Sequence, residues 1–75
     1  MLSPEIKELE EILIGLMREL GVSKVDAMIA LALIKAHHLQ EDMILWVATF
    51  QGREEELTAR GFMLYLYSLT DTLNE

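Results

Sequence analysis

Cysteine is absent from this chain of 75 residues, and proline occurs once, at Pro4. A chain without cysteine has no disulfide framework and no thiolate chemistry. Its longest uninterrupted apolar run, from Ala27 to Ile34, is far shorter than the ~18 residues that a membrane span requires. The N-terminus has neither the basic start nor the apolar stretch of a secretion signal. We therefore expect a cytoplasmic protein with no membrane contact.

Basic residues are scarce as well, because the chain has six of them against thirteen acidic residues, a net charge of −7. They are spread along the sequence, at Lys7, Arg18, Lys24, Lys35, Arg53 and Arg60. Nucleic-acid affinity depends largely on basic side chains that neutralise phosphates. Direct binding of DNA or RNA by this acidic chain is therefore disfavoured.

Apolar residues, by contrast, are abundant, at 52% of the sequence. A chain of this length forms one domain, residues 1–75, and a small domain has proportionally more surface than a large one. It should therefore be less apolar than average. The surplus predicts either that several copies share a core or that an apolar patch awaits a partner. We expect a homodimer, with a different protein partner as the alternative.

Residues 4–20 have the pattern of an amphipathic helix. Ser3 is a suitable N-cap, Pro4 fits the first helical position, and Gly21 is a stop signal. The apolar residues recur every three or four positions and so share one face: Ile6, Leu9, Leu13, Leu16 and Leu20.

A second helix is expected from Ser23, an N-cap with Asp26 three residues later, which is close to a capping box. The segment that follows, residues 27–36, is apolar in nearly every direction around the helix axis. Such a helix must be covered on all sides, and this chain has few other helices to cover it. The segment therefore supports the expectation of a shared core.

Two further helices complete an all-α, four-helix domain with short connections, in which we expect the second and fourth helices to be the most buried. The third, residues 40–51, begins with Glu41 and Asp42, which suit a helix start. The fourth runs from about Glu54 through segment 61–73 and contains Glu56 and Arg60 as an i,i+4 pair.

The boundary between the second and third helices is less marked, since no glycine or proline lies between Lys35 and Glu41. The two could form one helix of about 29 residues. The acids at positions 41 and 42 favour a new helix start, so we expect a break near residues 38–40.

Large apolar side chains of the last three helices carry the predicted dimer interface: Leu33, Trp46, Phe50, Phe62, Leu66 and Tyr67. Three methionines, Met28, Met43 and Met63, have two interpretations. They fill the core, or they belong to an adaptable surface, where methionine and aromatic residues are over-represented. Gly61, inside the fourth helix, is consistent with a close helix–helix crossing.

The adjacent His37 and His38 are the obvious candidates for a metal site. Neighbours on a helix lie about 100° apart and cannot chelate together. Pairing with Glu41 or Asp42 requires an unbroken helix and supplies two ligands, whereas a zinc site needs at least three. We interpret this stretch as a polar helix end and predict no metal and no cofactor. A metal-binding module assembled across a dimer axis is the alternative.

The corner between the second and third helices also invites comparison with a DNA-binding helix-turn-helix. That motif needs a polar, often basic, face on its second helix, and residues 41–51 contain no basic residue. A helix-turn-helix-like regulator would therefore have to act through a partner. The acids at 10–11 and 54–56 have the pattern of solvated helix starts and faces, so we predict no catalytic residues and no enzyme.

Overall fold

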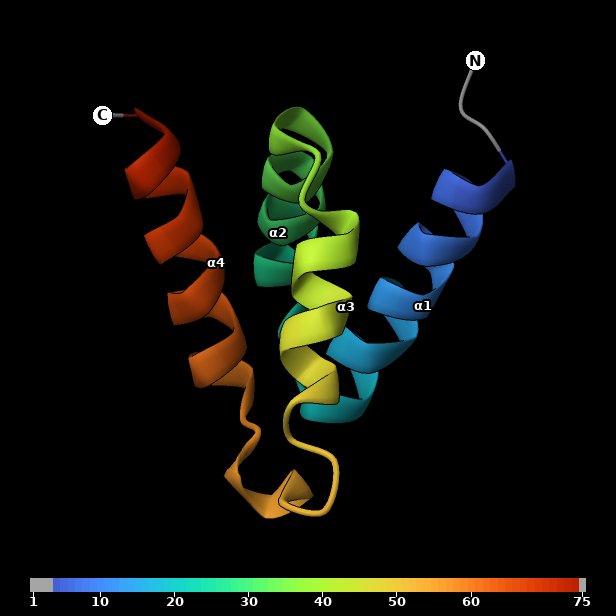
Figure 1. Cartoon of the computed structure of the whole chain (residues 1–75), viewed down its shortest axis with the longest axis vertical. Coiled ribbons are helices and arrows are strands. Elements are labelled where there is room, and N and C mark those ends of the chain that lie inside the picture. Colours follow the sequence, from blue (N-terminus) through green and yellow to red (C-terminus); the bar gives the residue numbers. More distant parts are fainter. Residues whose placement is uncertain (1–3, 75) are drawn as a thin grey trace.

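The fold of this protein, taken from a computed structural model that describes residues 4–74, is all-α, as the sequence predicts (Figure 1). Four α-helices and one short 3-10 turn follow one another with short connections: α1 Pro4–Leu20, α2 Lys24–His37, α3 Gln40–Ala48, η1 Glu54–Glu56 and α4 Ala59–Asn74. The predicted N-cap at Ser3 lies outside the described residues.

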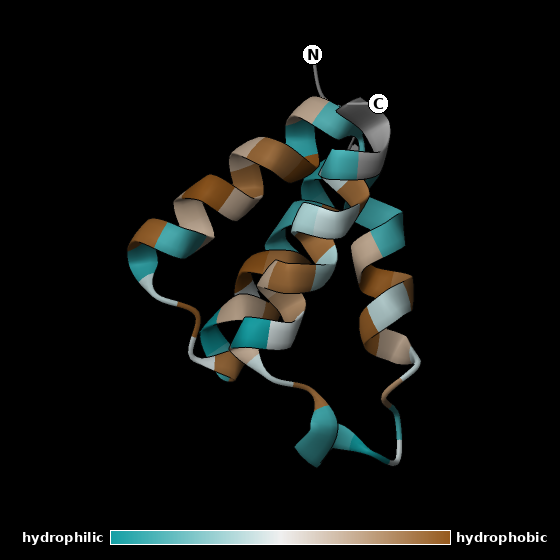
Figure 2. Ribbon diagram, turned by 90° about the vertical axis from the view of Figure 1, so that its left-hand side faces the viewer, coloured by the Kyte–Doolittle hydropathy of each residue, from teal (hydrophilic) through white to brown (hydrophobic). Residues whose placement is uncertain are grey.

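The four helices are arranged with α2 and α3 at opposite faces of the molecule. In Figure 1, α3 lies in front of α2, with α1 on one side and α4 on the other. The side view agrees, because it places α2 along one edge, α3 along the other and α4 toward the viewer (Figure 2). α1 packs against α2 and α3, and α2 packs against α4. The core is the space that these helices enclose.

That core draws residues from every α-helix. Six large side chains are almost completely buried: Leu13, Met17, Ile34, Met43, Phe62 and Leu66. Ala30, Leu39 and Met63 complete the cluster. Burying a large apolar side chain contributes roughly 1.5–3 kcal/mol, so this cluster supplies most of the driving force for folding.

Two helices end in the same backbone motif. After α1, Gly21 has φ +81°, its N–H donates to the Arg18 carbonyl, and the Val22 N–H donates to the Met17 carbonyl. This is the Schellman arrangement, in which a left-handed residue satisfies the last free carbonyls of the helix. The predicted stop at Gly21 is confirmed.

After α2 the same motif is built on a histidine. His38 has φ 56° and ψ 47°, and the Leu39 N–H donates to the Ile34 carbonyl at 2.9 Å. The predicted break between the second and third helices is therefore confirmed, and the left-handed residue is His38. Leu39 and Ile34 are both buried, which supplies the apolar contact that usually accompanies this motif.

We expect His38→Gly to stabilise the protein by about 1 kcal/mol, because a left-handed conformation disfavours a residue with a Cβ atom and suits glycine. The exposed His38 side chain makes this gain separable from any loss of packing. Urea unfolding followed by circular dichroism measures the change. Gly21→Ala, the reverse exchange in the same motif, should destabilise the protein. If both variants lowered stability, the left-handed strain at His38 would not be the controlling factor.

The N-terminal ends of α2 and α4 are both capped by hydroxyl side chains. Ser23 caps α2 as predicted, since the Asp26 N–H donates to its Oγ at 3.1 Å. Thr58 caps α4, accepting from the Gly61 N–H at 2.9 Å. A hydroxyl that accepts from the third residue beyond it fixes where a helix begins.

The boundaries predicted for the third and fourth helices need correction. α3 ends at Ala48 rather than at residue 51, and residues 54–56 form a 3-10 turn. Because Thr58 sets the start of α4, the prediction that the fourth helix begins near Glu54 is wrong. The helical pair of Glu56 with Arg60 is wrong for the same reason. Glu56 instead meets Arg53 at 3.5 Å, in an exposed pair that contributes little.

Gly61 lies where α4 approaches α3. A Cβ atom at this position would come within 3.1 Å of the Thr58 hydroxyl and 4.0 Å of the Trp46 ring. The close helix–helix crossing expected at this glycine is not found among the described helices, because only the outer edge of the long Trp46 side chain reaches it from α3. The closer contact for a side chain at this position is the Thr58 hydroxyl, which caps the same helix.

Candidate interaction surface

One face of α2 has no cover from the rest of the chain. Ala30 and Ile34, fully buried, point toward the core. The opposite side of the helix carries five exposed apolar residues, which we call the α2 face: Val25, Met28, Ile29, Ala32 and Ala36. These positions recur every three or four residues and therefore line one side of the helix.

The exposure of the α2 face is substantial. Val25 and Met28 are each 66% exposed and Ile29 is 43% exposed. The sequence indicated that this helix must be covered on all sides, and the expectation that it is among the most buried helices is wrong for the single chain. α1 and α4 pack on part of its circumference. The remaining part, which includes no charged residue on its midline, faces outward.

One groove runs beside the first two turns of α2, and a second lies at its N-terminal end. The groove toward α1 has a volume of about 370 Å³ and is lined by apolar residues that include Ile14, Met28 and Leu31. The groove toward α4 has a volume of about 440 Å³. The N-terminal part of the α2 face therefore has a hollow on either side, a shape that can interlock with another helical surface.

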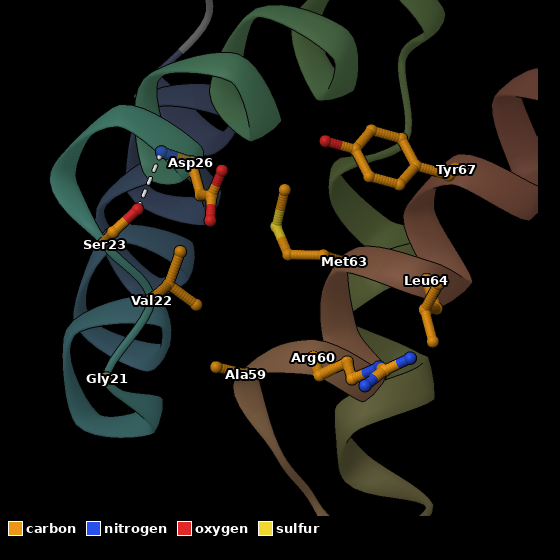
Figure 3. Close-up of a pocket in the computed structure, with 9 residues that line it drawn as sticks. All are labelled: Gly21, Val22, Ser23, Asp26, Ala59, Arg60, Met63, Leu64 and Tyr67. Carbon is orange, nitrogen blue, oxygen red and sulfur yellow. Dashed lines mark hydrogen bonds between the residues drawn. The ribbon is translucent and has the colours of Figure 1, made fainter.

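The α2–α4 groove has an apolar floor and polar walls (Figure 3). Val22 and Met63 lie at its centre, and the Tyr67 hydroxyl and the Asp26 carboxylate point toward the space beside Met63. Tyr67 is 38% exposed, so part of its ring is available to a partner.

Basic residues border this side of the molecule. Arg18 and Lys24 line the α1–α2 groove, and Arg60 lines the α2–α4 groove. Lys35, also exposed, lies on α2 itself. Four of the six basic residues of an acidic chain therefore surround the α2 face, and Asp26 is the acid among them.

The six residues predicted to form the interface occupy different environments. Phe62 and Leu66 are fully buried, so they belong to the core of the single chain, and we leave them out of the interaction surface. Leu33 is half-buried on α2, and Tyr67 lines the groove beside the α2 face.

Trp46 and Phe50 belong to an aromatic cluster that joins α3 to α4. The Trp46 ring stacks on Tyr65, with centroids 4.6 Å apart and planes at 8°. It meets Phe50 edge-on at 4.8 Å and Phe62 at 6.3 Å. Such pairs contribute roughly 0.5–1.5 kcal/mol beyond the area that they bury. Trp46 and Phe50 are therefore engaged within the chain.

The methionines divide in a similar way. Met43 is fully buried and Met63 is 8% exposed, so both fill the core, whereas Met28 is largely exposed. None of the five α2-face residues belongs to the predicted interface, and Val25, Met28 and Ile29 are the large ones among them. Their signal was the absence of any polar face on α2, which indicates an uncovered side without saying which side it is.

The histidine corner does not form a metal site in the described part of the chain. The break after His37 removes the register that would bring His37 to Glu41 and His38 to Asp42. Residues 4–74 hold no group of three or more His, Asp or Glu side chains that could bind a metal ion. His38 instead has a structural role, as the left-handed residue between α2 and α3.

The acidic run at residues 54–56 is exposed on η1. The Gly52 N–H donates to Glu54 Oε1 at 3.0 Å, and this hydrogen bond lowers the pKa of the Glu54 carboxyl. A general acid near neutral pH needs its pKa raised, so the shift at Glu54 has the opposite direction. This turn gives no support to acid–base chemistry.

Comparison with known proteins gives the chain no relatives: no protein-family model matches it, and neither a curated protein nor a solved structure matches it. No helix in the described residues combines the length and the hydropathy needed to cross a membrane. The functional proposal therefore rests on the α2 face.

Proposed function

We propose that this protein is a small acidic interaction module that associates with itself as a homodimer through the α2 face. One observation carries the proposal. Five outward positions along the whole of α2 are apolar and exposed, whereas the exposed apolar residues of the other helices, such as Leu45 and Leu64, do not form a row of this length. Contiguous apolar surface of this kind marks interaction sites more often than it occurs idly on a monomer.

The composition supports the same proposal independently. The chain carries more apolar residues than a domain of its size is expected to hide, and part of that surplus lies on α2. A second copy that covers α2 would let its apolar residues be buried on all sides, as its sequence pattern requires. We propose no catalytic activity and no nucleic-acid partner, and the cytoplasmic location stays a prediction.

The test is the mass of the protein in solution, measured by light scattering after size exclusion over a wide range of protein concentrations. The proposal predicts twice the mass of the chain, with dissociation to single chains on dilution. A single-chain mass at every concentration would refute self-association.

A further inference from the structure

The midline of the α2 face is formed by small residues. At about 100° per residue, Val25, Ala32 and Ala36 project within a narrow sector, and Met28 and Ile29 project to either side of it. The distance between two packed helices depends on the side chains at their contact. Ala32 and Ala36 carry one methyl group each, so a second helix can approach α2 most closely there.

The α2 face is also complementary to itself. It presents two large side chains, Met28 and Ile29, on either side of the alanines, with one groove beside its first two turns and a second at its N-terminal end. A two-fold interface requires one patch that supplies both the projections and the hollows. When α2 of one copy lies on α2 of another, the large side chains of each copy can enter the grooves of its partner.

The exposed area of the chain can be compared with the area that a dimer interface buries. Its accessible surface is 5310 Å². A compact monomer of the same mass would expose about 4,700 Å², so the excess is on the order of 600 Å². Each partner of a standard interface buries about 800 Å². The excess of the whole chain is thus of the same order as the area that one partner of a dimer buries.

From these features we infer that two copies pair back to back about a two-fold axis, with α2 crossing the α2 helix of the second copy at Ala32. This arrangement rests on the proposed function, which states that the chain dimerises, and adds where and how. It leaves α3, at the opposite face, exposed in the dimer.

A single cysteine placed at the crossing tests the arrangement directly, because the chain has none of its own. In Ala32→Cys the two thiols lie beside the two-fold axis, and mild oxidation should convert the protein to a disulfide-linked dimer on a non-reducing gel. The matched control is Ala48→Cys, an exposed alanine on α3 at the opposite face, which should stay a single chain.

The outcomes separate this inference from the proposed function. If the unmodified protein is a dimer but Ala32→Cys does not cross-link, the crossing at Ala32 is wrong and dimerisation stands. Cross-linking of Ala48→Cys in preference to Ala32→Cys would move the interface to α3 and overturn the arrangement. If the unmodified protein is a single chain at all concentrations, both proposals fail.

Salt provides a second readout. A back-to-back pair brings Arg18, Lys24, Lys35 and Arg60 of each copy toward the same residues of the other, and each whole chain carries a net charge of −7. Both effects oppose association and both are screened by salt. The dimer dissociation constant should therefore fall as sodium chloride is raised. A dissociation constant that rises with salt would indicate acidic-on-basic docking and contradict the arrangement.

Discussion

Phe62→Ala is expected to destabilise the protein by about 3–5 kcal/mol, the range measured for removing a buried aromatic side chain and leaving a cavity. Phe62 is fully buried at the centre of the core and touches the aromatic cluster through Trp46. Small domains have a free energy of unfolding near the lower end of 5–15 kcal/mol. We therefore expect a large fraction of this variant to be unfolded at 25 °C.

Urea unfolding followed by the fluorescence of Trp46 measures this change, because Trp46 is the one tryptophan of the sequence and lies 6.3 Å from the Phe62 ring. Leu64→Ala is the control, a truncation on the same helix at a residue that is 55% exposed. It should change stability by well under half as much. A Phe62→Ala protein that kept its stability but lost its dimeric state would return Phe62 to the interface.

Met28→Glu is expected to weaken self-association at least about 100-fold, which corresponds to about 2.7 kcal/mol. At 66% exposure the new carboxylate is solvated in the single chain, but a partner covering the α2 face would strip much of its water, and the basic residues that border the grooves offset only part of that cost. Both copies carry the substitution, so the penalty applies twice. Sedimentation equilibrium gives the dissociation constants to compare.

The folding of the single chain should hardly change in this variant. Glutamate and methionine have similar helix propensities, and an exposed substitution usually alters stability by less than about 0.5 kcal/mol. Thermal unfolding at a concentration where both proteins are single chains separates this effect from dimer dissociation. A large loss of stability there would show that Met28 is needed within the chain.

The helices themselves could be predicted because their signals are local. Gly21 and Ser23 punctuate the chain between the first two helices, and the structure uses both as expected. The break at His38 was predicted from the acids that follow it rather than from the residue itself. Histidine is enriched in left-handed conformations relative to most non-glycine residues, but His37 and His38 are adjacent, so the identity of the turning residue could not be read from the sequence.

The start of α4 was misplaced because two local signals competed. Three consecutive acids at 54–56 favour a helix start through the helix dipole, whereas Thr58 offers a hydroxyl to the Gly61 N–H. The cap, which makes a direct hydrogen bond, sets the boundary. The acidic residues 54–56 form only a single 3-10 turn.

The interaction surface was the least predictable part, because burial depends on tertiary packing. Phe62 and Met28 are both large and apolar in sequence, yet one is fully buried and the other is 66% exposed. The overfilled pattern of residues 27–36 indicated that all sides of α2 need cover. Which side remains open depends on how α1, α3 and α4 pack around it, and no local signal encodes that.

The mass in solution of two matched variants, Met28→Glu and Leu45→Glu, tests the central claim most directly. Met28 and Leu45 are 66% and 64% exposed and lie on opposite faces, on α2 and α3. At a concentration where the unmodified protein is a dimer, light scattering should show Met28→Glu as a single chain and Leu45→Glu as a dimer. A dimeric Met28→Glu protein, or loss of the dimer in Leu45→Glu alone, would contradict the assignment of the α2 face as the interaction surface.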